Sequence, residues 1–413
     1  MKDHDTIFRY IGITAIVLLL FGLAGWYFFI SGRTADLEGA AQARGFDIGI
    51  PSFSGSRGST AENIAVGFGT PLTGEAAVPA SGTKRAPRLW RVNSSPVAGA
   101  GFVSSGSTTI LRFIERSTGH IFDADPETGT VVRRTNKLIP RVYEAMVGNG
   151  DSVIERSLDD KGVLSTFSGT LGTTTVDGFV PLTGVDLGSE VRDIAISGVP
   201  DAVFLASRSG MTFLIRSMLG GEKPKEIISL AGGDFNLALV HDGRMILTER
   251  AASGIPSNSY EAQSGTLVPL ARNVPGLTLL AHASSSAVLI GSDDGQSLSL
   301  SLRSSKDASA VSLPIRTTAD KCAWAPGTSL TAYCAVPQES PGPGFLTNWY
   351  RGTVHTTDSW FEVDGAAGTA TAFFSMDAES ITDVEHPSVD DTGNYLAFMN
   401  ARDKSLWILR ITE

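Results

Sequence analysis

The feature that most constrains the fold is a repeat of about 45 residues that runs from Arg88 to the C-terminus. In each period, apolar segments of about five residues alternate with clusters of Gly, Asp, Asn, Ser and Pro. This is the pattern of short β-strands joined by tight turns. The recurring segment centres on Trp90, Val132, Val180, Ile227, Val268, Leu313 and Phe373, at spacings of 41 to 48 residues and a last spacing of 60.

Each period contains about four apolar segments. In the fifth period they cover residues 276–281, 287–290, 297–302 and 311–315. Four short strands in 40–45 residues are the dimensions of a β-propeller blade. A β-sandwich or jelly roll is the alternative, but neither has a reason to repeat at a fixed interval. We therefore predict an all-β, seven-bladed propeller with four-stranded blades over residues 88–413.

The two ends of the repeat predict how the ring closes. The last period has only three strands, around Val384, Leu396 and Trp407, whereas the segment 89–92 has no blade before it. If the strand around Trp90 completes the last blade, every strand edge inside the ring is paired.

Two local motifs support this fold. The segment 386–398, His-Pro-Ser-Val-Asp-Asp-Thr-Gly-Asn-Tyr-Leu-Ala-Phe, resembles the repeat of WD40-like propellers of the TolB type. The segment 322–330, Cys-Ala-Trp-Ala-Pro-Gly-Thr-Ser-Leu, looks like a second copy. Val389 replaces a proline of the family pattern and Thr392 lengthens the turn. The resemblance implies a propeller and does not identify a ligand, because this fold has many functions.

An uncharged, apolar run covers residues 11–30. As a helix it would be about 30 Å long, which matches the hydrocarbon core of a bilayer. Trp26 and Tyr27 lie near one end, where aromatic rings favour the interface. The alternative is a cleaved signal peptide, whose apolar region is normally shorter and closely followed by small residues. We predict a retained transmembrane helix at 11–30.

The flanking charges predict the orientation of this helix. Lys2 and Arg9 precede it and Arg33 follows it. This slight bias favours a cytoplasmic N-terminus, residues 1–10, and an extracytoplasmic C-terminal body of a single-pass cell-membrane protein. Residues 31–87 are rich in Gly, Ser, Ala and Pro without an apolar period, so we predict a flexible tether. The alternative is that part of this segment packs on the body.

Composition excludes several kinds of function. The net charge is −10 and no Lys/Arg run occurs, which argues against a nucleic-acid partner. The six histidines are scattered, and the acid-rich segment 123–129 lacks the spacing of an EF-hand, so we predict no metal and no cofactor. No nucleophile elbow, P-loop or dinucleotide fingerprint is present, so no residue is predicted to be catalytic.

The two cysteines, Cys322 and Cys334, flank a turn at 325–328. A hairpin there would place them opposite each other, with Cβ atoms about 4.5–5.5 Å apart. An extracytoplasmic body would favour oxidation. We predict a disulfide, with two small buried apolar side chains as the alternative.

The long sixth period contains an insertion at 337–358. An insertion in one repeat maps to a loop on one face, often the binding face. Trp349, Tyr350 and Arg351 in this loop are residue types that are enriched in binding hot spots. They are therefore candidate binding residues. The alternative is that Trp349 and Tyr350 only pin the loop to its own blade.

Three functions are compatible with these patterns. The first is a membrane-anchored binding or scaffolding module of the cell envelope, with another envelope protein as its partner. The second is an extracytoplasmic hydrolase-type enzyme that uses the propeller channel for a glycan or peptide. The third is a structural subunit of an envelope assembly.

Overall fold

A computed structural model of the chain describes residues 85–412, apart from 107, 149, 197–200, 220–222, 241–242 and 376–381. The predicted cytoplasmic N-terminus, transmembrane helix and nearly all of the predicted tether lie outside the described residues. Among the residues that are described, no helix has both the length and the apolar character needed to cross a bilayer.

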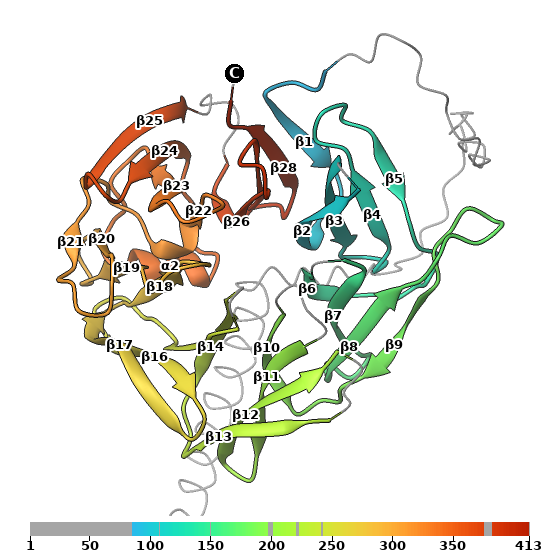
Figure 1. The fold of residues 1–413 in the computed structure, drawn as a ribbon, viewed down its shortest axis with the longest axis horizontal. Coiled ribbons are helices and arrows are strands. Elements are labelled where there is room, and N and C mark those ends of the chain that lie inside the picture. The colour runs from blue at the N-terminus through green and yellow to red at the C-terminus, as the bar shows by residue number, and fades with distance from the viewer. Residues whose placement is uncertain are drawn as a thin grey trace, which may run out of the picture. The chain divides into compact units, whose positions relative to one another are not determined.

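Seven four-stranded antiparallel sheets form the blades of a β-propeller (Figure 1), which confirms the predicted fold. In the first six blades the four strands follow one another in the chain, and the first strand of each is innermost. Blade one comprises β2 (Val97–Ser105), β3 (Thr108–Glu115), β4 (Ile121–Ala124) and β5 (Val131–Arg133); blade two comprises β6 (Val142–Val147), β7 (Ser152–Leu158), β8 (Leu164–Leu171) and β9 (Leu182–Asp186); blade three comprises β10 (Val191–Ile196), β11 (Asp201–Arg208), β12 (Met211–Met218) and β13 (Lys225–Leu230).

The repeating segment found in the sequence falls on or beside the outermost strand of each blade. These are β5, β9, β13, β17, β21, β25 and, in the last blade, β1. Blade four comprises β14 (Phe235–Leu239), β15 (Met245–Glu249), β16 (Pro256–Gln263) and β17 (Thr266–Pro275); blade five comprises β18 (Thr278–Ala281), β19 (Val288–Asp293), β20 (Leu298–Arg303) and β21 (Val311–Ser312); blade six comprises β22 (Cys322–Trp324), β23 (Thr331–Pro337), β24 (Asp358–Asp364) and β25 (Thr369–Ser375).

Blade seven is built from both ends of the propeller. It comprises β26 (Val384–Val389), β27 (Tyr395–Asn400), β28 (Leu406–Arg410) and β1 (Leu89–Asn93). Strand β1 pairs antiparallel with β28 and places Trp90 opposite Ile408. Beside it, Arg88 Nε donates to the Arg410 carbonyl at 3.3 Å. The predicted closure of the ring by the strand around Trp90 is therefore confirmed.

Apolar side chains between neighbouring blades form the core. Between blades six and seven, Trp360, Phe398 and Leu409 are fully buried, and the Trp360 and Phe398 ring centroids lie 5.5 Å apart. Burial of this kind stabilises by about 25 cal/mol per Å² of apolar surface.

Near the axis, β2 approaches β6 so closely that a Cβ at Gly99 would lie 1.9 Å from the Ala145 carbonyl oxygen. Only glycine fits there.

The insertion separates β23 from β24, as the sequence predicted, and covers residues 338–357. It contains a helix that the sequence did not predict, α2 (Phe345–Tyr350). A segment of six residues preceded by Pro-Gly-Pro-Gly is too short for a helical period to be recognised, and so short a helix depends on tertiary packing. Phe345, Leu346 and Trp349 are buried in a cluster with Leu298 of blade five. A 3₁₀ helix, η1 (Ala319–Lys321), precedes β22.

Candidate functional site

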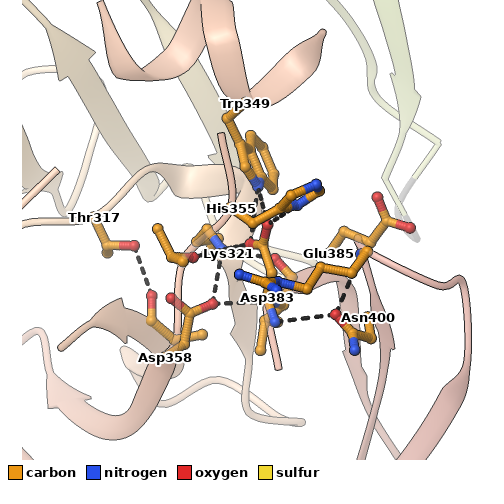
Figure 2. Close-up of polar contacts among 12 residues, drawn as sticks. Thr317, Lys321, Trp349, His355, Asp358, Asp383, Glu385 and Asn400 are labelled. Carbon is orange, nitrogen blue, oxygen red and sulfur yellow. Dashed lines mark hydrogen bonds and ion pairs between the residues drawn. The ribbon is translucent and has the colours of Figure 1, made fainter. Parts of the chain in front are cut away.

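The blade-six insertion and the starts of three strands, two in blade six and one in blade seven, meet on one face of the propeller. Successive strands of a blade run in opposite directions, so loops that enter an innermost strand share a face with loops between second and third strands. Lys321 directly precedes β22, Asp383 directly precedes β26, and Asp358 is the first residue of β24. These three charged side chains, far apart in the sequence, converge beneath the insertion (Figure 2).

Lys321 is completely buried. Its Nζ lies 2.6 Å from Asp383 Oδ1 and 2.7 Å from Asp358 Oδ2, and it donates to Thr356 Oγ1 and the Val384 carbonyl, each at 3.1 Å. Burial by itself would lower the pKa of Lys321, but the two carboxylates outweigh it and the pKa is raised. Because removing one partner of such a group leaves an uncompensated buried charge, this triad is sensitive to single substitutions.

Asp383 collects donors from the insertion. Trp349 Nε1 donates to its two oxygens at 2.9 and 3.1 Å, His355 Nδ1 lies 2.9 Å from Oδ2, and Thr356 Oγ1 donates to Oδ1 at 2.9 Å (Figure 2). Burial acts to raise the pKa of Asp383, but the His355 and Trp349 hydrogen bonds and the Lys321 ion pair hold it well below its usual range. Asp383 is thus held as a carboxylate that fixes the insertion to blade seven.

A second buried carboxylate ties the insertion to blades four and five. Asp293, at the end of β19, accepts from the Leu346 backbone N–H at 2.9 Å and from Ser253 Oγ at 2.6 Å. The Ser253 N–H donates to Thr347 Oγ1 at 2.8 Å, and the Thr347 N–H donates to Ser253 Oγ at 3.0 Å. The base of the insertion is therefore bonded to three blades besides its own.

The three predicted binding residues have different environments. Trp349 is 8% exposed, and its indole joins the buried network through Asp383, which belongs to blade seven and not to the blade of the insertion. Tyr350 is 38% exposed, and Arg351 is exposed as well. Tyr350 and Arg351 remain candidate binding residues.

Sequence reasoning missed Lys321, His355, Asp358 and Asp383. None belongs to a local motif, and Lys321 and Asp383 are 62 residues apart. Their position in the repeat could have indicated them. Lys321, Asp358 and Asp383 each stand at the start of a strand, in blade six, which carries the insertion, or in the neighbouring blade seven.

The predicted disulfide is present between Cys322 and Cys334. The two residues are directly opposite in the β22–β23 pair, which is the geometry that the hairpin argument required. Since Cys322 follows Lys321 in the chain, the disulfide also fixes the backbone at the edge of the charged network.

A second charged group lies where β6 and β10 begin. Arg156 Nη1 is 2.5 Å from Glu144 Oε2 and 3.9 Å from Asp193 Oδ1. Arg156 Nη2 donates to the Arg192 carbonyl at 2.8 Å, and Asp193 Oδ2 accepts from the Leu237 N–H at 2.8 Å. Burial, and then the nearby Glu144, raise the pKa of Asp193 to about 6. These contacts join blades two, three and four.

The acid-rich segment 123–129 is occupied by protein contacts. Asp123 pairs with Arg112 at 2.8 Å, and Asp125 caps the turn by accepting from the Glu127 N–H at 2.8 Å. Within the part of the chain that the structure describes, no three His, Cys, Asp or Glu side chains are grouped so as to hold a metal ion.

Comparison with known proteins supports the fold. No protein-family model and no curated protein matches the chain. Similar solved structures include the propeller domain of Cps50 (Swd1) from Myceliophteria thermophila (10% identity, 78% of this chain and 100% of that chain, TM-score 0.52). Others are YCF48 bound to D1 peptide (10%, 79% and 96%, 0.50) and TolB from Acinetobacter baumannii (11%, 71% and 60%, 0.39). The propeller fold that the WD40-like, TolB-type resemblance implied is confirmed by the seven four-stranded sheets and by the similarity to the Cps50 propeller domain.

Proposed function

We propose that this chain is a membrane-anchored binding module of the cell envelope, and that its partner docks on the propeller face that carries the blade-six insertion. The observation that supports this most is the contrast within residues 338–357. The base of the insertion is held by buried hydrogen bonds to Asp293 and Asp383, whereas Tyr350 at the end of α2 is 38% exposed and Val354 beyond the helix is 37% exposed.

A fixed base favours binding because it removes part of the entropy cost of ordering a loop at an interface. Tyr and Arg side chains contribute strongly to protein interfaces when a partner buries them. Tyr350 and Arg351 lie directly after the last buried anchor, Trp349. The packing of the ring does not explain why these two side chains are exposed. Docking of a partner on this face would bury them and would give them a role.

The predicted membrane helix at 11–30 and tether at 31–87 fit the same function. A tethered propeller meets other envelope proteins at a high effective concentration, so modest contacts suffice for capture. Another envelope protein is therefore the partner class we propose, with the propeller on the extracytoplasmic side.

We also propose that the role is non-enzymatic. The carboxylates near the innermost strands are engaged in holding blades together: Glu144 and Asp193 pair with Arg156, and Asp193 accepts a backbone N–H of blade four. A general acid and base for hydrolysis need carboxyl oxygens that can reach a substrate.

The binding proposal is tested with the full-length protein in detergent-solubilised membranes. Tyr350→Ala/Arg351→Ala should reduce the recovery of specific partners in a quantitative pulldown by tenfold or more, at unchanged thermal stability. The matched control is Val311→Ala/Arg272→Ala, which removes one exposed apolar side chain and one exposed Arg from the outer strands β21 and β17. Equal recovery of all partners by both double variants would refute the proposed surface.

The anchoring proposal has its own test. Full-length protein should sediment with membranes, resist alkaline carbonate extraction and be cleaved by protease added outside the cytoplasm. A chain that lacks residues 11–30 should lose membrane association. Full-length protein in the soluble fraction, or protection of the propeller from external protease, would contradict the proposed topology.

A further inference from the structure

The buried triad beneath the insertion brings a primary amine and a carboxyl group into contact in a site without exposed surface. Lys321 Nζ lies 2.7 Å from Asp358 Oδ2, and both side chains have no exposed area. We propose that Lys321 and Asp358 condense to an intramolecular amide, an isopeptide bond between Nζ and Cγ, and that Asp383 carries the protons for this step.

Proximity favours the reaction. Both groups are held in place by their backbone: Lys321 is the last residue of η1 and directly precedes the disulfide-bonded Cys322, and Asp358 begins β24. Fixed reacting groups reach effective concentrations of about 10⁵–10⁸ M. A condensation that does not proceed between free amines and carboxylates in water therefore becomes accessible here.

The hydrogen bonds of Asp358 identify the oxygen that leaves. Its Oδ2 also accepts from the Val384 N–H at 2.8 Å, whereas its Oδ1 is buried without a hydrogen-bond partner. A buried polar atom without a partner is costly. In the amide, Oδ2 becomes the carbonyl oxygen and keeps the Val384 N–H, and the unpartnered Oδ1 departs in water. The product thus removes the unpartnered oxygen, and Asp383 keeps its contacts with Trp349, His355 and Thr356 when it loses the charge of Lys321.

Asp383 is placed to act as the proton carrier. Its Oδ1 lies 2.6 Å from Lys321 Nζ, and its other contacts hold it as a carboxylate. It accepts one proton from the ammonium, which leaves a neutral amine whose lone pair attacks Cγ of Asp358. The C–N bond forms, the bond from Cγ to Oδ1 breaks, and two of the three ammonium protons leave with Oδ1 as water. Asp383 is regenerated as a carboxylate, and no oxidant or reductant is consumed.

The surroundings protect the product. The Trp349 ring centroid lies 4.8 Å from Nζ, and the side chains of Lys321, Asp358 and Asp383 have no exposed area. Exclusion of water disfavours hydrolysis of the amide and strengthens the electrostatic contacts that guide the protons. We expect the bond to accumulate after folding.

Mass spectrometry of the intact, purified protein tests the bond. After full reduction and denaturation, the mass should be lower than that of the unmodified chain by one water. Peptide mapping should recover one linked species that joins the peptide around Lys321 to the peptide around Asp358. A reduced, denatured protein with the full unmodified mass refutes the proposal, and so does a water loss that maps to Asp383 or to any other position.

Variants test the assigned roles. Asp383→Asn keeps both reacting groups but removes the proton carrier, so the full mass should return; persistence of the linked peptide would overturn the role of Asp383. The control is Glu385→Gln. Glu385 lies in β26, the strand that Asp383 directly precedes, and pairs with Lys404 at 2.8 Å. Unlike the triad, both of these side chains are partly exposed. This variant should retain the water loss at Lys321, and Lys404 should be unmodified in all samples. Circular dichroism verifies that each variant is folded.

Discussion

The indole N–H of Trp349 donates to both carboxylate oxygens of Asp383, and this contact joins the insertion of blade six to the first residue before the innermost strand of blade seven. The same carboxylate is ion-paired with Lys321. An aromatic residue in an inserted loop therefore serves the ring itself. The exposed residues that follow it, Tyr350 and Arg351, are the ones that a partner could contact.

The first prediction concerns the stability of this anchor. Trp349→Ala should lower the free energy of unfolding by about 3 kcal/mol or more, because it leaves a cavity and removes the indole N–H that donates to both oxygens of Asp383. Trp349→Phe should cost less, about 1–2 kcal/mol, because it keeps most of the apolar contact and loses only the N–H. Tyr350→Ala, at a half-exposed neighbour, should stay within about 0.5 kcal/mol of the wild type.

Urea denaturation of the three variants provides the measurement. Equal midpoints for Trp349→Ala and the wild type would mean that the indole is not part of the folded network. If Trp349→Ala is strongly destabilised but its folded fraction still captures partners, the binding role belongs to Tyr350 and Arg351 and not to the tryptophan.

The second prediction concerns the disulfide. Mass spectrometry of unreduced protein should show one intramolecular bond between Cys322 and Cys334, with no thiol that can be alkylated after unfolding. The two residues are 12 apart in the sequence, and closing so short a loop stabilises by about 3 kcal/mol in the chain-entropy model. Cys322→Ala/Cys334→Ala should lower the unfolding midpoint accordingly. An unchanged midpoint together with two reactive thiols in the wild type would contradict the bond.

The fold was largely predictable because its signals are local and repeated. The apolar segment whose spacing revealed the blades lies on or beside the outermost strand of each blade, for example at Val132 in β5 and at Phe373 in β25. The opposed cysteines of β22 and β23 follow from a single hairpin turn. The missing fourth strand of the last period predicted the pairing of β1 with β28.

The site was not predictable for the opposite reason. Lys321, Asp358 and Asp383 lie at three strand starts that approach one another only when blades six and seven pack together. No spacing within one blade marks them as partners. Helix α2 was missed because its stability comes from burial of Phe345 and Leu346 and not from a sequence period.

The third prediction tests closure of the ring. A chain that begins at Lys84 retains β1 and should unfold in one cooperative transition. A chain that begins at Val97 lacks β1, so the edge of β28 loses its partner and the Trp90 and Val92 contacts with the blade-one core disappear. We expect the shorter chain to aggregate, because an open edge strand is a template for pairing between molecules. Identical melting curves and identical solubility for the two chains would refute the closing role of β1.

The last prediction concerns Glu155, which lies in β7 with no exposed area and with both carboxyl oxygens lacking a hydrogen-bond partner. Burial raises the pKa of Glu155 to about 8, and the nearby Lys137 offsets this only in part. In an unfolded chain the pKa of a Glu is about 4.3. Between these two values the folded protein binds the extra proton, so the contribution of Glu155 to stability is fully present below about pH 4.3 and is lost as the pH rises to about 8.

Glu155→Gln keeps the shape of the neutral acid and removes the titration. The stability of Glu155→Gln relative to the wild type should therefore increase from pH 5 to pH 8, by roughly 1 kcal/mol for each pH unit. Glu226→Gln, at an exposed glutamate of β13, is the control and should track the wild type at each pH. Denaturation curves at pH 5, 6.5 and 8 give the comparison, and a difference between Glu155→Gln and the wild type that does not change with pH would show that Glu155 is ionised in the folded protein.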